Sequence, residues 1–263
     1  MTTSSDVYTL HRGTVPLLVS TPHAGTEIPA DIAARLVPRA LATEDADWHL
    51  TPLYAFAKDL GASILTPRYA RYVVDLNRPP ENTPMYPGQN NTGVVPTVFF
   101  TSDPLYRDGR SPDDAEVRRR IQRYWQPYHD AIEAELSRLV AEHGRAMIFD
   151  GHSIQQRLPW LFEGALPELN LGTADGQSCS PSLRERFVSI LSSQHEFSWV
   201  VDGRFKGGYI TRRYGEPARH RHAVQMEMCW HCYLADPHDW DAGRAARVQP
   251  VLVAIARALI DGP

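Results

Sequence analysis

Two short apolar runs of this 263-residue chain each lead into a turn that carries a histidine, and this feature most restricts the possible fold. Residues 15–21 precede His23, and residues 146–150 precede His152. Short runs of this composition, bounded by Gly and Pro, are typical of buried strands. Because the carboxyl ends of neighbouring parallel strands open on one crevice, we expect the two histidines to meet there.

Helical and strand patterns alternate along the rest of the chain. Residues 45–60 have helical apolar spacing and stand before two candidate strands, 63–66 and 72–76. A strand, a helix and a strand at this spacing indicate a crossover unit. Further predicted elements are a helix from an N-cap at Ser111 to about 142 with a kink near Pro127, a helix at 181–192, strands at 198–202 and 223–228, and a closing helix at 241–260. The whole chain, 1–263, is therefore predicted to be one α/β domain with a mixed, mostly parallel sheet flanked by helices.

Two segments lack a regular pattern. Residues 79–104 contain six prolines, and a loop of this length in a compact domain indicates a lid or a binding loop, unless it is an insertion without a role. Residues 155–180 are also expected to be irregular.

Composition narrows the functional class. The formal net charge of -4 argues against a broad basic face for nucleic acid, and the expected partner is a small molecule. No apolar run approaches the roughly 18 residues of a membrane span, and the first residues do not resemble a signal peptide. Three cysteines do not make a disulfide framework, so a cytoplasmic location is expected.

A third candidate strand carries Glu227, which would bring a carboxylate to His23 and His152. Two neutral imidazoles and one carboxylate are typical ligands of a catalytic Zn²⁺ ion, with a fourth position left for water. The carboxylate ligand is one of Glu27, Glu44, Asp45 or Asp47. The alternative is that each histidine is only a packed or surface residue.

Other catalytic patterns are absent. The sequence has no G-x-S-x-G, G-x-G-x-x-G or G-x-x-x-x-G-K-[ST] motif, which removes the usual hydrolase, dinucleotide and P-loop signals. Cys229 and Cys232 form a C-x-x-C pair that has no second pair to complete a zinc ribbon, and we interpret it as a chance match.

Cationic side chains suit an acidic ligand. Arginine binds carboxylates with two parallel hydrogen bonds. The pair Asn77-Arg78, at the end of the candidate strand and before the proline-rich segment, is the first choice, and Arg212-Arg213 lies in a glycine-punctuated segment. Solvation of surface arginines is the alternative.

A set of motifs, in order along residues 15–235, resembles the N-formylglutamate amidohydrolase family. The motifs are Ser20-Thr-Pro-His-Ala-Gly25, Asp45-Ala-Asp-Trp-His49, Arg71-Tyr-Val-Val-Asp-Leu-Asn-Arg-Pro79, Asp150-Gly-His-Ser153, Leu166-Pro-Glu-Leu-Asn-Leu-Gly-Thr173, Gly203-Arg-Phe-Lys-Gly-Gly-Tyr-Ile-Thr-Arg212 and His222-Ala-Val-Gln-Met-Glu227. The resemblance implies a fold similar to that of zinc carboxypeptidases and aspartoacylases. It also implies hydrolysis of N-formyl-L-glutamate to formate and L-glutamate, the last step of a histidine-degradation route.

The resemblance further implies a role for individual residues. One divalent ion, Zn²⁺, would be held by His23, Asp47 and His152, and Glu227 would be the general base. Arg71 would stabilise the oxyanion. Asn77 and Arg78, together with Arg212 or Arg213, would bind the substrate carboxylates.

Two alternatives stay open. The same residues could deacylate another acidic amino acid, such as N-formylaspartate, or the chain could be a metal-free carboxylate-binding protein with this fold. The oligomeric state does not follow from the sequence.

Overall fold

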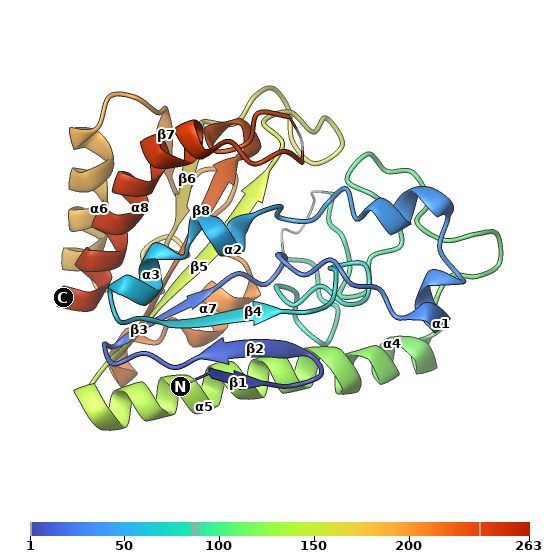
Figure 1. Cartoon of the computed structure of the whole chain (residues 1–263), viewed down its shortest axis with the longest axis horizontal. Helices are drawn as coiled ribbons and strands as arrows, with labels where there is room; N and C mark the ends of the chain where they lie inside the picture. Colours follow the sequence, from blue (N-terminus) through green and yellow to red (C-terminus); the bar gives the residue numbers. More distant parts are fainter. Residues whose placement is uncertain (1, 86–87, 89, 237) are drawn as a thin grey trace.

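One mixed sheet forms the centre of the molecule (Figure 1). The structure, a computed structural model, describes residues 2–85, 88, 90–236 and 238–263. In these residues the strand order is β1-β2-β4-β3-β5-β8-β6-β7. The strands are β1 (Thr2–Ser4), β2 (Tyr8–His11), β3 (Leu17–Ser20), β4 (Ser63–Pro67), β5 (Ala146–Ile154), β6 (Leu169–Gly172), β7 (Trp199–Val201) and β8 (Arg221–Cys229).

The four central strands run parallel, from β4 through β3 and β5 to β8. Strands β1 and β2 add an antiparallel edge, and β6 is antiparallel to β8 but parallel to β7. The sheet is thus mixed and mostly parallel, which confirms the predicted fold class.

Helices cover both faces of the sheet. The helices are α1 (Ala30–Ala33), α2 (Leu50–Leu53), α3 (Phe56–Asp59), α4 (Asp114–Arg120), α5 (Gln126–His143), α6 (Pro181–Ser193), α7 (Tyr209–Tyr214) and α8 (Ala242–Asp261). Apolar residues of α2, α3, α6 and α8 pack on one face, and those of α5 and α7 pack on the other.

The central strands carry apolar residues on both faces because both faces are buried, and polar residues occur mainly toward the ends of β5 and β8. In β3, Leu17 and Val19 belong to the cluster under α8, whereas Leu18 points to the cluster under α5. This alternation follows from the two-residue period of a strand. It explains why these runs are visible in the sequence as continuous apolar segments.

The register of β5 and β8 positions two of the predicted site residues. The two strands are parallel, and His152 is the partner of Glu227. Strand β3 lies on the other side of β5 and ends at Ser20, shortly before His23.

The helix predicted at 45–60 is instead a turn followed by two short helices, α2 and α3. Asp47 donates its backbone N–H to the carbonyl of His23 at 3.0 Å, and His49 adopts a left-handed backbone with a φ of 57°. The left-handed backbone of His49 prevents a continuous helix through this residue, so α2 begins at residue 50. The turn gives Asp47 a fixed place beside His23.

The strand predicted at 72–76 was wrong, because this segment is a series of turns. Asp75 donates its N–H to the carbonyl of Val94, and its carboxylate accepts the N–H of Asn77 at 2.9 Å. Val73 and Val74 are buried among side chains of the α5 face. A β-branched run can therefore be buried without a strand partner when loops satisfy its backbone.

The long helical region begins and bends differently from the prediction. Its N-cap is Asp113, not Ser111, because the carboxylate of Asp113 accepts the N–H of Glu116 at 2.8 Å. A π turn at Ile121–Trp125 joins α4 to α5 directly before Pro127. The distortion predicted near Pro127 thus takes the form of a wider turn.

The loop 79–104 reaches the site, as expected for a binding loop, and no helix or strand occurs in its described part. Residues 86, 87 and 89 lie outside the described residues. The other segment expected to be irregular, 155–180, contains strand β6, and β1 and β2 were not predicted either.

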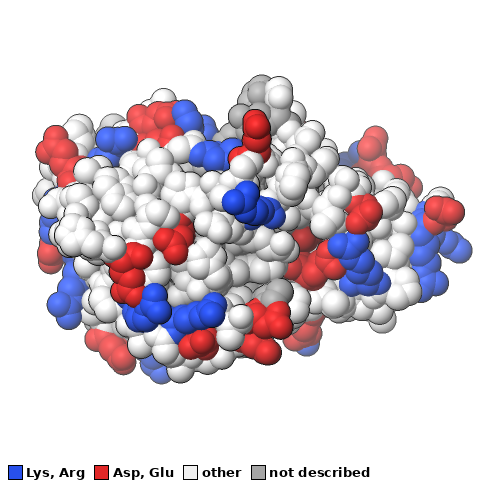
Figure 2. All heavy atoms as spheres, turned by 90° about the horizontal axis from the view of Figure 1, so that it is seen from above, with Lys and Arg blue, Asp and Glu red and all other residues white. Residues whose placement is uncertain are grey.

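The surface matches the modest net charge. On the face shown in Figure 2, Lys and Arg side chains are interspersed with Asp and Glu, and no broad basic area forms. Within the described residues, no helix is both long enough and apolar enough to cross a membrane.

Candidate metal centre and substrate cavity

Three potential metal ligands converge beyond the carboxyl end of β3 and beside β5. The Nδ1 atoms of His23 and His152 lie 3.1 Å apart, so these imidazoles meet as the strand ends predict. The Oδ2 atom of Asp47 lies 3.2 Å from His152 Nδ1 and 3.7 Å from His23 Nδ1. All three side chains are buried.

Close packing of glycines fixes the backbone beside both histidines, although the turn predicted for His152 is wrong, since β5 continues through it to Ile154. A Cβ added to Gly25 would lie 2.3 Å from the carbonyl oxygen of Tyr69, and one added to Gly151 would lie 2.8 Å from the ring of Tyr54. Both distances are too short for a side chain. Glycine is therefore required on each side of the site by close approach of the neighbouring segment.

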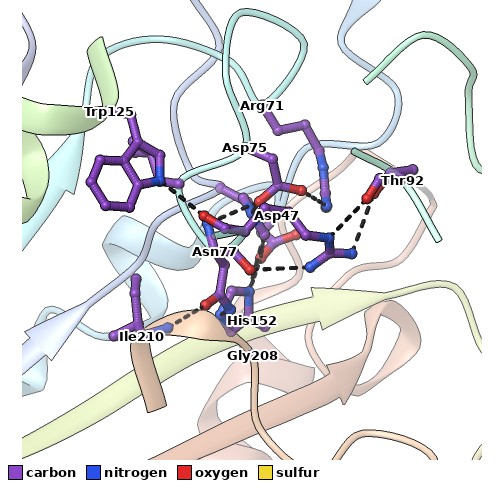
Figure 3. A network of polar contacts seen from close by, with 12 residues as sticks. Asp47, Arg71, Asp75, Asn77, Thr92, Trp125, His152, Gly208 and Ile210 are labelled. Atoms are coloured by element: carbon purple, nitrogen blue, oxygen red, sulfur yellow. Dashed lines mark hydrogen bonds and ion pairs between the residues drawn. The ribbon is translucent and has the colours of Figure 1, made fainter. Parts of the chain in front are cut away.

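A second set of carboxylates, Asp75 and Asp150, orients the two imidazoles, and Figure 3 shows Asp75 near Asp47 and His152. Asp75 accepts a hydrogen bond of 2.7 Å from His23 Nε2, and Asp150 Oδ2 lies 3.2 Å from His152 Nε2. In both histidines Nδ1 is the atom that points toward Asp47. Metal-binding histidines characteristically use their second nitrogen in this way.

The local charge favours a cation. Although burial acts in the opposite direction, hydrogen bonds from His152 and His23 hold the pKa of Asp47 below its ordinary value. Burial also opposes charge on His152, but Asp150 and Asp47 raise its pKa well above the usual value. Asp75 is buried too, and the charges of His23 and Arg71 keep its pKa low. The lowered pKa values of Asp47 and Asp75 place two ionised carboxylates next to the imidazoles.

These residues fit a divalent metal of the zinc type. The donors are two imidazole nitrogens and one carboxylate oxygen, which Zn²⁺ prefers, and their separations are close to those of neighbouring ligands around one ion. The chain supplies three donors at this point, as in catalytic zinc sites that keep a position for water or substrate.

The other candidate carboxylates have different partners. Glu27 pairs with Arg68 at 2.7 Å, and Glu44 pairs with Arg39. Asp45 is buried, but its Oδ2 atom accepts the backbone N–H of Phe100 at 3.0 Å. Asp47 is therefore the carboxylate that the structure brings to the histidines.

A cavity opens from this group and contains Glu227 in its wall. Its lining includes His23, Asp47, Arg71, Asn77, Arg78, Phe100, His152, Leu161, Arg204, Gly208, Gln225 and Glu227. Burial raises the pKa of Glu227 to about 8; His152 opposes this rise and Asp47 adds to it. Gln225 donates a hydrogen bond of 3.3 Å to Glu227 Oε2. A carboxylate with a raised pKa can exchange a proton near neutral pH.

Arg71 is buried next to the three potential metal ligands, and it also lines the cavity. Its Nη2 atom donates to Asp75 at 2.7 Å, and its guanidinium lies over the ring of Phe100, 4.5 Å from the centroid. Burial acts against its charge, yet Asp75, Asp47 and Asp45 raise the pKa of Arg71 above its ordinary value. A charged donor is thus held at the cavity wall.

Asn77 lines the cavity and also contacts the outer carboxylates, which are Asp75 and Asp150. Its Oδ1 atom accepts the N–H of Ile210 at 2.8 Å, which directs the amide nitrogen to His152 Nε2 at 2.9 Å (Figure 3). A Cβ on Gly208 would lie 2.2 Å from this amide. The position of Asn77 is therefore set by the segment that begins α7.

Arg78 lines the cavity while it also holds the long loop. Its guanidinium donates to the carbonyl and the hydroxyl of Thr92 and to the carbonyl of Asn77. Trp125, at the end of the π turn, donates its indole N–H to the carbonyl of Arg78 at 3.0 Å.

The structure does not bring Arg212 and Arg213 to this cavity. Both are exposed on α7, where Arg212 donates to the carbonyl of Gly207 and Arg213 lies 3.9 Å from Glu216. A different arginine, Arg204, lines the cavity.

The family follows from comparison with known proteins. A family model described as N-formylglutamate amidohydrolase matches residues 15–234. The chain belongs to this family.

Relatives cover nearly the whole chain. A protein of Pseudomonas putida named N-formylglutamate deformylase is 42% identical over 97% of this chain and 96% of its own length. A protein of the same name from Pseudomonas aeruginosa is 44% identical, again over 97% and 96%. The crystal structure of N-formylglutamate amidohydrolase from Ralstonia eutropha has a TM-score of 0.80 and 25% identity, and 97% of each chain is covered.

For this member of the N-formylglutamate amidohydrolase family, the sequence did not single out Asp75, Asp150 and Arg204 as site residues. The two aspartates stand next to predicted site residues, two positions before Asn77 and before His152. That spacing is a signal for carboxylates that orient metal ligands. Arg204 directly follows Gly203 in the same motif that ends at Arg212.

A second group of potential ligands lies outside the cavity, and it includes one cysteine of the C-x-x-C pair. Glu168, His231 and Cys232 have donor atoms within 4.8 Å of one another. The Glu168 carboxylate already accepts the N–H and hydroxyl of Ser198 and contacts His231. Arg244 and Arg247 line the same pocket, and their charge opposes a cation there.

Proposed function

We propose that this chain hydrolyses N-formyl-L-glutamate to formate and L-glutamate with one bound divalent metal, Zn²⁺. The observation that carries the proposal is the presence of His23, Asp47, His152 and Glu227 in one buried cavity of a member of this family. The names of the two Pseudomonas relatives support the formylated amino acid as substrate. If N-formyl-L-glutamate is the substrate, the reaction would be the last step of the histidine-degradation route that the sequence resemblance implies.

The metal fits His23, Asp47 and His152. When bound, Zn²⁺ supplies Lewis-acid chemistry that polarises a carbonyl and makes water a better nucleophile at neutral pH. The outer carboxylates, Asp75 and Asp150, would hold the two imidazoles in the orientation that this binding needs.

Glu227 would move the proton. Its carboxylate accepts a proton from the attacking water and later delivers it to the amine nitrogen of the departing glutamate. The raised pKa of Glu227 suits both transfers, because an acid–base group works best when its pKa is close to the operating pH. Gln225 would keep the carboxylate directed into the cavity.

Arg71 and Arg78 would bind the negative charges of the reaction. Arg71 is charged, buried and anchored by Asp75, so it can stabilise the oxygen that becomes negative during the attack without reorganising. Asn77 and Arg78 line the cavity next to this group and would hold the α-carboxylate of the substrate.

The experiment is a formate-release assay of the zinc-loaded protein. We expect the highest kcat/KM for N-formyl-L-glutamate, with N-formyl-L-aspartate and N-acetyl-L-glutamate as the comparison substrates. A preference for N-formyl-L-aspartate or for the acetylated substrate would assign the same residues to another acidic amino acid. Binding of these compounds without hydrolysis in the zinc-loaded protein would contradict the proposal and favour a carboxylate-binding protein.

A further inference from the structure

A substrate with two carboxylates requires two cationic contacts. The second contact was predicted to be Arg212 or Arg213, but the structure places a different arginine in the cavity. The guanidiniums in the cavity wall belong to Arg71, Arg78 and Arg204, among the described residues. Arg71 is engaged by Asp75 through an ion pair of 2.7 Å. Because the proposed function assigns Arg71 to the oxyanion, Arg78 and Arg204 are the candidates for the two carboxylates.

Arg204 lies where the cavity adjoins a neighbouring groove. Together with Leu161 and Asn90 it also lines this groove, which continues along Pro159–Pro167. Arg78, in contrast, donates to the carbonyl of Asn77, whose amide nitrogen lies 2.9 Å from His152 Nε2. Of these two arginines, Arg204 borders the neighbouring groove and Arg78 does not, whereas Arg78 contacts Asn77 beside His152.

Contacts with the chain restrict the guanidinium of Arg204. Its Nη2 and Nε atoms lie 3.0 Å and 3.4 Å from the carbonyl oxygen of Leu161, and its charge lies over the ring of Phe205, 5.1 Å from the centroid. Asn90 donates to the carbonyl of Trp160 at 2.6 Å, which ties the long loop to the same wall. A guanidinium held in this way loses little freedom when it binds an anion.

The two carboxylates of N-formylglutamate also differ in their distance from the reacting bond. The α-carboxylate is attached to the carbon next to the amide nitrogen, whereas the other lies beyond the methylene groups of the side chain. With the formyl group directed to His23 and His152, the near carboxylate would lie on the side of Arg78, and the far one would extend toward the groove that Arg204 borders.

We infer that Arg204 binds the side-chain carboxylate and so selects glutamate over neutral amino acids of the same size. This inference rests on the proposed function. It replaces Arg212 and Arg213, which are exposed outside the cavity, as the second carboxylate contact.

The test compares two substrates of nearly identical shape, N-formyl-L-glutamate and N-formyl-L-glutamine, in zinc-loaded wild type and Arg204→Gln. We expect Arg204→Gln to lower kcat/KM for the glutamate substrate by about 10- to 150-fold, which is typical for loss of a charge-assisted contact. The value for the glutamine substrate should stay close to that of wild type. Arg219→Gln is the matched control, because Arg219 is exposed and pairs with Glu216 at 3.0 Å.

The outcomes separate this inference from the proposed function. If wild type does not hydrolyse N-formyl-L-glutamate, the proposed function fails. If wild type hydrolyses it but Arg204→Gln has the same ratio of kcat/KM values for the two substrates as wild type, Arg204 does not bind the side-chain carboxylate. The inference is then overturned. An equal loss on both substrates, with a lower melting temperature, would show that Arg204 only braces Leu161, and it would overturn the inference as well.

Discussion

At the scale of single residues, Glu227 has the most specific task. Glu227→Gln keeps the shape of the side chain but cannot take up a proton, so we expect kcat to fall by about 10²- to 10⁴-fold. Metal content and KM should change little. Steady-state kinetics combined with metal analysis checks this, and loss of zinc from the variant would instead make Glu227 a ligand.

Asp75 affects the metal through His23. Asp75→Asn removes the charge that faces His23 Nε2, and changes of such outer partners typically weaken metal affinity about 10- to 100-fold. Competition with a chelator measures the effect. Asp45→Asn is the control, because Asp45 is also a buried aspartate but contacts Phe100 instead of the histidines. Equal loss of affinity in both variants would indicate general destabilisation.

Arg78→Lys tests the α-carboxylate contact. Lysine keeps the charge but loses the planar pair of donors, so kcat/KM should fall by roughly 10- to 150-fold. The loss should be the same for N-formyl-L-glutamate and N-formyl-L-glutamine, since both carry the α-carboxylate. If the guanidinium only braces the long loop through Thr92, the melting temperature will fall and kcat/KM will not.

At the scale of the elements, the π turn at Ile121–Trp125 supports the substrate cavity. It presents the indole N–H of Trp125 to the carbonyl of Arg78 while the ring stacks on His129 at 3.6 Å. Trp125→Phe keeps an aromatic ring and removes the donor, at a cost of about 1 kcal/mol or roughly fivefold in kcat/KM. Trp199→Phe on β7 is the control, and an equal effect of both substitutions would contradict this role.

The elements also show where prediction from the sequence succeeds. Strands β3, β5 and β8 are buried on both faces, so their apolar runs are unmistakable and their carboxyl ends predict the meeting of His23 with His152. The segment 72–76 has the same composition but is buried by loops, and composition alone cannot distinguish these cases. The exposure of Arg212 and Arg213 depends on how α7 docks, which spacing does not reveal.

At the scale of the whole molecule, the chain concentrates charges of both signs inside a protein whose net charge is -4. The carboxyl groups of Asp47, Asp75 and Asp150 lie around the histidines, and the guanidiniums of Arg71, Arg78 and Arg204 line the adjoining cavity. Carboxylates suit a metal ion and guanidiniums suit an anionic substrate beside it. The low dielectric of the buried cavity strengthens both interactions.

The central claim is that one metal ion binds between His23, Asp47 and His152. Anomalous diffraction at the zinc edge, from crystals of the zinc-loaded protein, tests it most directly. We predict one strong peak about 2.0–2.2 Å from the Nδ1 atoms of both histidines and from a carboxylate oxygen of Asp47. No peak at this position, or a strong peak only at Glu168, His231 and Cys232, would contradict the account.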